Sequence, residues 1–134
     1  MSAVVTRRLA DEFLARLGAG DIDAFASLFS SDLRFDIPGD VGALPWIGKR
    51  TGRQAAADFL RGLRELVEPL RFEVRDILAN ERRAVILGEL ASRSRQTGKT
   101  VESPFAIVLT VANGEIGELL MFEDSYAVSR AARP

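Results

Sequence analysis

The second half of the chain alternates apolar and polar residues over four long runs. The first run opens with Leu70-Arg-Phe-Glu-Val-Arg, which has the period of two of a strand with one buried face. Asn113-Gly114, between the last two runs, is typical of a two-residue hairpin turn. We therefore predict an antiparallel meander whose strands are long enough for the sheet to coil under its own twist. The predicted strands cover about 70–79, 83–93, 100–112 and 115–123.

Helical periodicity dominates the first half of the chain. Apolar residues recur every four positions from Val5 to Leu17, and Gly18-Ala-Gly20 is placed to end that helix. Asp21 is placed to cap a short second helix, whose face we expect to include Phe29. Thr51-Gly-Arg-Gln54 reads as a capping box that opens a third helix, and Pro69 is expected to close it. The apolar stripe of the third helix comprises Ala56, Phe59, Leu60, Leu63, Leu66 and Val67.

One strand and one loop separate the second and third helices. Leu33 to Ile37 alternates and predicts a short strand, and the segment from Pro38 to Gly52 predicts a long loop. Trp46 in this loop favours an ordered segment, because an indole is normally buried against something. With a short helix after Asp124, the order is α-α-β-α-β-β-β-β-α, which indicates one α+β domain over residues 1–134. We expect the three main helices to cover the concave face of the sheet and to leave a pocket.

Composition narrows the possible chemistry. The net charge of −1 and the scattered arginines disfavour nucleic acid as a partner. The sequence has no cysteine and no histidine, so we expect no disulfide, no metal and no cofactor. Acid–base chemistry would have to use Asp, Glu, Tyr126, Arg, Lys or water. Neither a signal peptide nor an apolar run long enough for a bilayer is visible, so a soluble, cytoplasmic protein is expected.

Seven short phrases stand in order along the chain: Gly20-Asp21-Ile-Asp-Ala-Phe-Ala-Ser-Leu-Phe29, Asp32-Leu-Arg-Phe-Asp-Ile-Pro-Gly39, Trp46-Ile-Gly48, Thr51-Gly52, Thr97-Gly98-Lys99, Asn113-Gly-Glu-Ile116 and Phe122-Glu-Asp124. Together they resemble the SnoaL-like branch of the nuclear transport factor 2 superfamily. The resemblance implies a cone-shaped fold in which a curved antiparallel sheet wraps around the helices. The superfamily includes isomerases, epoxide hydrolases, cyclases, dehydratases and binding modules, so the fold does not settle the function.

The polar residues of two well-understood activities of the superfamily are missing at the matching positions. Ketosteroid isomerases use a phenol, a carboxylate base and a neutral carboxylic acid, a case that is a standard example of pKa tuning. Limonene-epoxide hydrolases use an arginine and two aspartates around a water. The matching positions in this chain are Phe13, Ile37 and Phe105 or Ala106 for the isomerases, and Gly88, Leu90 and Met121 for the hydrolases.

Four carboxylates remain as candidate catalytic groups, and each has a structural alternative. Asp124 matches the closing aspartate of the family but could instead cap the last helix. Asp36 neighbours the isomerase-type base position but could form a surface or interface ion pair. Glu89 lies among apolar strand residues, where burial would raise its pKa, but could pair with Arg93 at an interface. Glu123 shares a strand face with Leu119 and Met121 that the resemblance places in the cavity.

Two functions follow from this picture. In the first, a small, largely hydrophobic molecule occupies the pocket and undergoes cofactor-free acid–base chemistry, such as isomerisation, cyclisation, dehydration or hydration. In the second, the protein is a non-catalytic module that binds a ligand or partner. For either function we expect a homodimer that associates through the convex face of the sheet. The expected pocket lining is Phe13, Phe29, Ile37, Trp46, Phe59, Leu63, Leu90, Phe105 and Met121.

Overall fold

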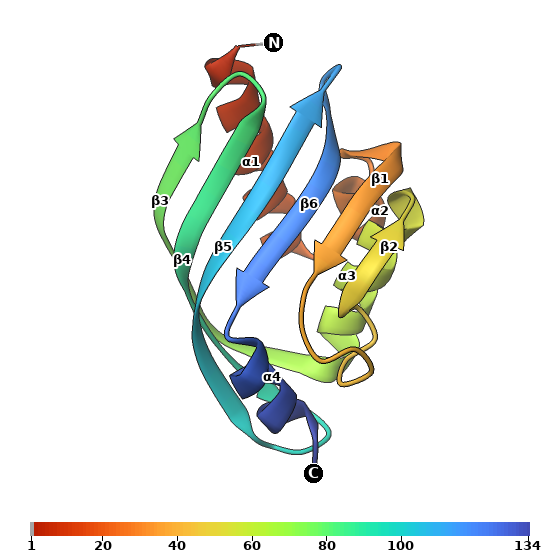
Figure 1. Ribbon diagram of the computed structural model, residues 1–134, viewed down its shortest axis with the longest axis vertical. Helices are drawn as coiled ribbons and strands as arrows, with labels where there is room; N and C mark the ends of the chain where they lie inside the picture. The colour runs from red at the N-terminus through yellow and green to blue at the C-terminus, as the bar shows by residue number, and fades with distance from the viewer. Residues whose placement is uncertain (1) are drawn as a thin grey trace.

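The computed structural model describes residues 2–134, and Figure 1 shows their arrangement. Helices come first and a six-stranded sheet dominates the second half, which confirms the predicted α+β cone with a short C-terminal helix. None of the helices within residues 2–134 is long and apolar enough to cross a membrane. The elements are α1 (Ala3–Ala19), α2 (Ile22–Ala26), β1 (Phe29–Ile37), β2 (Gly48–Thr51), α3 (Arg53–Leu66), β3 (Val67–Ala79), β4 (Arg83–Ser94), β5 (Thr100–Ala112), β6 (Glu115–Glu123) and α4 (Ser125–Ala132).

The strand order in the sheet is β2-β1-β6-β5-β4-β3. Strands β3 to β6 form the predicted meander, and every neighbouring pair within it is antiparallel. Asn113 and Gly114 have φ of 53° and 76°, the positive values that a type I′ hairpin turn requires. The local pattern of the sequence therefore located these turns correctly.

Two features of the sheet differ from the prediction. Strand β1 runs parallel to β6, so the sheet is not purely antiparallel. These strands are far apart in the sequence, and no hairpin between them fixes their relative direction. The predicted loop also contains β2, which pairs with β1 at the sheet edge. Its residues after Gly48 are exposed, so β2 lacks the apolar alternation that would have revealed it.

The boundaries of α2, β1, α3 and β3 also differ from the prediction. Helix α2 ends at Ala26, and Phe29 begins β1 instead of extending the helix. The capping box does not form, because Thr51 ends β2 and Gly52 caps α3 without a side-chain hydrogen bond. Pro69 lies inside β3 and does not close α3, which ends at Leu66. A proline is tolerated there because β3 is an edge strand.

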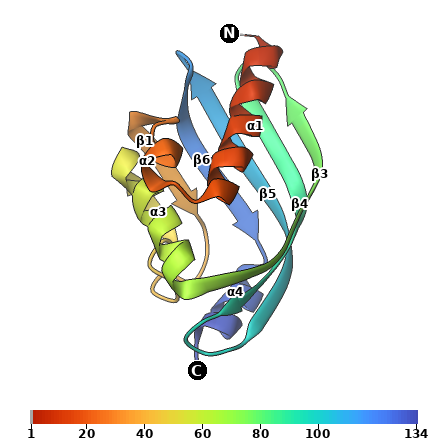
Figure 2. The ribbon, with the colours of Figure 1, turned by 180° about the vertical axis from the view of Figure 1, so that it is seen from behind.

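Helices α1 and α3 lie over the concave face of the curved sheet, as Figure 2 shows from behind. Helix α1 packs on β3 and β4, and α3 packs on β1 and α2. At the α1–α2 end, the rings of Phe13, Phe25 and Phe29 meet with centroids 5.1–6.3 Å apart. This aromatic cluster fills one end of the space between sheet and helices, so that any cavity must lie toward the other end.

Helix α4 packs at that other end. Ser129 and the guanidinium of Arg133 donate hydrogen bonds to Asp40, at 2.6 and 2.9 Å, and tie α4 to the segment between β1 and β2. These two bonds, with that of Arg133 first, hold the pKa of the Asp40 carboxyl below its usual value. The hydroxyl of Thr97 donates to the carbonyl of Ala131 at 2.6 Å and fixes α4 to the β4–β5 turn. These hydrogen bonds hold α4 in place, so that the helix closes this end of the space between the sheet and the other helices.

Candidate functional site

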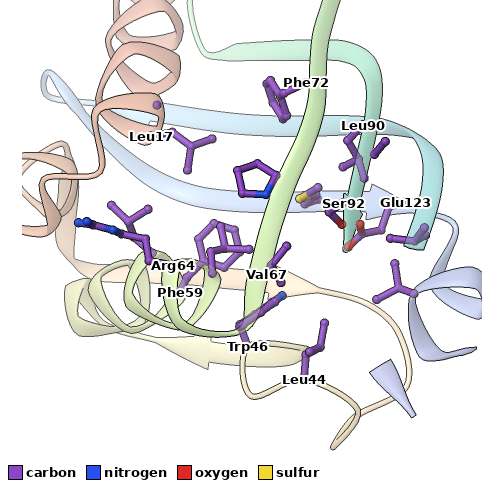
Figure 3. A pocket seen from close by; sticks show the side chains of 18 of the residues that line it. Leu17, Leu44, Trp46, Phe59, Arg64, Val67, Phe72, Leu90, Ser92 and Glu123 are labelled. Atoms are coloured by element: carbon purple, nitrogen blue, oxygen red, sulfur yellow. The ribbon is translucent and has the colours of Figure 1, made fainter. Parts of the chain in front are cut away.

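A cavity of about 640 Å³ lies between the concave face of the sheet and helices α1, α3 and α4 (Figure 3). Most of its lining is apolar, and strand β3 passes across it. A volume of this size is in the range of small-molecule sites. The hollow that the sequence led us to expect is therefore present.

Six of the nine expected lining residues border the cavity. Trp46 is the one that comes from the segment between β1 and β2, and its ring meets that of Phe59 edge-on at 5.9 Å. Gly62 on α3 makes room for the indole, because a Cβ there would lie 2.9 Å from Trp46 Cε3. The six residues are Phe13, Trp46, Phe59, Leu63, Leu90 and Met121.

The other three expected residues lie outside the lining. Phe29 is enclosed in the aromatic cluster at the α1–α2 end. Ile37 is fully buried in the core at the end of β1. Phe105 does point to the concave side, but Phe72 of the edge strand stacks on it, with ring centroids 4.8 Å apart and an interplanar angle of 20°.

Sequence reasoning missed several lining residues. Phe72 alternates with Leu70 and Val74 in the first predicted strand, a pattern that puts the three residues on one face but does not indicate that this face borders the cavity. Arg64, at the exposed end of α3, gave no signal that it borders a cavity. Leu17 and Leu44 enter the lining through the ends of α1 and the β1–β2 segment, whose positions depend on tertiary packing.

Glu123 is the one candidate carboxylate that lines the cavity. It follows Leu119 and Met121 on the concave face of β6 and is partly buried. No hydrogen bond or ion pair to its carboxyl occurs within the described residues 2–134. Burial raises the pKa of the Glu123 carboxyl to about 7, because the charged form loses hydration that no protein group replaces.

The structure places the other three candidate carboxylates away from the cavity. Asp124 caps α4 by accepting a hydrogen bond from the Ala127 amide at 3.0 Å. Glu89 points to the outer face and accepts a hydrogen bond at 2.7 Å from Arg75, not from Arg93. Asp36 lies opposite Lys49 in the β1–β2 ladder, on the face opposite its two buried neighbours in β1.

The other lining residues with polar or charged side chains are Ser92, Ser94, Arg64, Arg71 and Arg95. Figure 3 shows Ser92 on the same side of the cavity as Glu123, and Arg64 at the opposite end. Within residues 2–134, no group of three or more Asp or Glu side chains is arranged to hold a metal ion. In this largely apolar cavity, the carboxyl of Glu123 can give or take a proton near neutral pH.

Comparison with known proteins supports the fold independently. The sequence model of the SnoaL-like domain family matches residues 10–119. An NTF2-like protein from Burkholderia xenovorans LB400 is 26% identical, covers 99% of each chain and has a TM-score of 0.89. No curated protein matches the sequence.

Two further solved structures are similar to this chain in fold. A candidate isomerase from Rhodopseudomonas palustris is 17% identical over 96% of this chain and 95% of its own, with a TM-score of 0.79. A candidate polyketide cyclase from Pseudomonas putida KT2440 is 20% identical over 95% of this chain and 96% of its own, with a TM-score of 0.71. At these identities the similarity concerns the fold alone.

Proposed function

Because the chain belongs to the SnoaL-like domain family, whose fold is shared by unrelated activities, we propose a function from its own cavity. The protein binds a small, largely hydrophobic molecule there, and Glu123 transfers a proton to or from that molecule without a cofactor. The single observation that carries this proposal is a partly buried carboxyl, whose pKa is raised by burial to about 7, on the wall of a largely apolar cavity.

The position of Glu123 suits general acid–base catalysis. A group with a pKa near 7 is present in both protonation states at neutral pH, so it can accept a proton at one atom and return it at another. Isomerisation, cyclisation and dehydration of a carbonyl compound need such a step. The apolar surroundings keep water away from the proton in transit and strengthen each electrostatic contact with the substrate.

A second function, a binding module without catalysis, is supported by a different observation. Within residues 2–134, apolar side chains stand at the positions that match the phenol and the neutral carboxylic acid of the steroid isomerases. The matching positions are Phe13 and, near the third, Phe105, which are both apolar and buried. In this function Glu123 would serve only to recognise a donor group of the ligand.

The protonation of Glu123 can be measured directly by a carboxyl-carbon NMR titration. We expect one glutamate to titrate near pH 7 and its signal to disappear in Glu123→Gln. Glu118→Gln is the matched control, because Glu118 lies on the same strand but pairs with Arg34 at 2.9 Å. If every glutamate titrates near 4.5, the acid–base proposal fails and the binding function remains.

Binding can be tested with the neutral fluorescent probe N-phenyl-1-naphthylamine. Leu63 lines the cavity, so the larger side chain in Leu63→Trp should fill part of the cavity and weaken binding of the probe. Val4→Trp, at an exposed site on α1, should leave the affinity unchanged. A probe that does not bind, or that binds both variants equally, would contradict ligand binding in the cavity.

We also propose that the protein is a homodimer that associates through the outer face of the sheet. Apolar residues form two cross-strand rows on this face, and Leu78, Leu87 and Phe122 are 53%, 36% and 49% exposed. Ion pairs such as Arg75–Glu89 and Arg34–Glu118 flank the rows and could exchange partners across a two-fold axis. The rows are Leu78-Val85-Val108-Leu120 and Leu87-Ala106-Phe122.

A further inference from the structure

The charged residues that line the cavity differ in their ion pairs and in their exposure. Besides Glu123 they are Arg64, Arg71 and Arg95. Arg71 pairs with Glu73 at 3.7 Å, and Arg95 is an exposed residue just beyond the end of β4. Figure 3 shows the side chain of Arg64 beside Leu17, at the end of the cavity opposite Glu123.

Arg64 is held in place by the end of α1. Its guanidinium donates a hydrogen bond through Nη1 to the carbonyl of Gly20, the left-handed residue that terminates α1. A Cβ on Gly20 would lie 3.3 Å from that nitrogen, so the glycine also gives the guanidinium room to approach closely. The head group at this mouth of the cavity is therefore positioned in advance, which lowers the entropic cost of using it to bind a ligand.

Most of the hydrogen-bonding capacity of Arg64 is unused. A guanidinium has five N–H donors, and one contact to a carbonyl leaves the charge without a counter-ion. Within residues 2–134 no carboxylate lies within 4 Å of it, whereas Arg61, one helical turn earlier on α3, pairs with Asp58 at 3.0 Å. A fixed, unneutralised guanidinium beside an apolar cavity is suited to bind an oxyanion in a bidentate manner.

We propose that the ligand of this cavity is an amphipathic acid, with its apolar body between the sheet and α3 and its carboxylate or similar oxyanion on Arg64. The proposal rests on the proposed function, since it specifies the chemical class of the molecule that the cavity binds. It also orients the ligand. With the anion on Arg64, the opposite end of the molecule lies toward Glu123, so the group that exchanges a proton is remote from the acid group.

Two fluorescent probes with the same arylamine framework separate charge from apolar contact. N-phenyl-1-naphthylamine is neutral, and 1-anilinonaphthalene-8-sulfonate adds one anionic group. We expect the sulfonate to bind the wild type more tightly than the neutral probe does. Arg64→Gln should weaken binding of the sulfonate about tenfold, the loss typical of a charged hydrogen bond. The same substitution should change the affinity for the neutral probe less than about twofold. Arg61→Gln, on the same helix, should affect neither.

Two further variants keep the test decisive. Arg64→Lys retains the charge and should keep part of the preference for the sulfonate even if losing the contact to Gly20 lowers stability. Leu63→Trp should weaken both probes, which shows that they occupy the cavity. If the neutral probe binds there but Arg64→Gln leaves the sulfonate unchanged, the amphipathic-acid proposal is overturned and the proposed function stands. If Leu63→Trp affects neither probe, both proposals are overturned.

Discussion

Gly88 lies directly opposite Phe105 on strands β4 and β5, and the phenyl ring occupies the space where a side chain of Gly88 would stand. A Cβ at position 88 would lie 2.6 Å from Phe105 Cζ and would also collide with the carbonyl oxygen of Glu73. The ring of Phe72, which lines the cavity, stacks on the ring of Phe105. The missing side chain on β4 therefore makes room for the ring of Phe105 against which Phe72 is stacked.

We predict that Gly88→Ala destabilises the fold by about 2–3 kcal/mol, because backbone as well as a ring must move to accept the methyl group. Urea unfolding measures the change. Gly18→Ala is the control, since a Cβ at Gly18 on α1 would meet no atom within 4 Å. That control should be neutral or stabilising by up to about 1 kcal/mol. Equal free energies of unfolding for the two variants would show that β3 and β4 can move apart to accept the methyl group without loss of stability.

A second prediction concerns the contact between Gly62 and Trp46. Gly62→Ala places a methyl group 2.9–3.0 Å from two ring carbons of the indole, so Trp46 must shift toward the cavity or toward solvent. Trp46 is the only tryptophan in the chain, so its emission maximum and its quenching by acrylamide report the shift directly. Gly117→Ala, whose Cβ would have its nearest neighbour at 3.9 Å, should leave the emission unchanged. Unaltered emission in Gly62→Ala would contradict the close packing of Gly62 against Trp46.

The parts of the molecule that could be predicted are those set by local patterns. Alternation and Asn113-Gly114 located the meander, and periodicity located α1 and α3. Local patterns could not show that Phe105 lies outside the cavity lining, because its ring is covered by Phe72 of the edge strand β3. Which side chains of β3 face the cavity depends on the register shifts near Pro69 and Val74. A one-residue slip moves a side chain to the opposite face, so site residues follow from the register and not from strand existence.

The candidate carboxylates show the same division. Asp124 was recognisable as a helix cap, since a capping residue acts within three positions of itself. The partner of Glu89 is Arg75, on the neighbouring strand, and only the pairing of β3 with β4 brings them together. The family resemblance placed the strand face of Glu123 in the cavity, but the burial that raises the pKa of its carboxyl depends on tertiary packing, so the raised pKa could not be predicted from the sequence.

The raised pKa of Glu123 predicts how stability depends on pH. The folded protein holds this proton up to about pH 7, whereas an unfolded glutamate releases it near 4.5. The associated stability is thus complete below pH 4.5 and is lost as the pH rises through 7, by up to about 3 kcal/mol. In Glu123→Gln this loss should be absent, so the difference in free energy of unfolding between variant and wild type should grow in favour of the variant from pH 5 to pH 8.

Urea unfolding at several pH values tests that dependence. Glu118→Gln should keep the wild-type slope, because Glu118 lies on the outer face beside Arg34. Asp40 acts in a different window: its lowered pKa affects stability only as the pH falls toward and below the normal range of aspartate. Parallel curves for wild type and Glu123→Gln between pH 5 and 8 would contradict the burial of an unpaired carboxyl.

The outer face of the sheet gives the last prediction. Wild-type protein at tens of micromolar should have twice the chain mass of 14.6 kDa by light scattering, since burying Leu87 and Phe122 against a second copy removes apolar surface from water. Leu87→Glu places a charge in the centre of that contact and should give the monomer mass with the fold retained by circular dichroism. Val41→Glu, at a 71% exposed site outside this face, should remain dimeric. A wild-type mass of 14.6 kDa under these conditions would show that the outer face has no second copy against it.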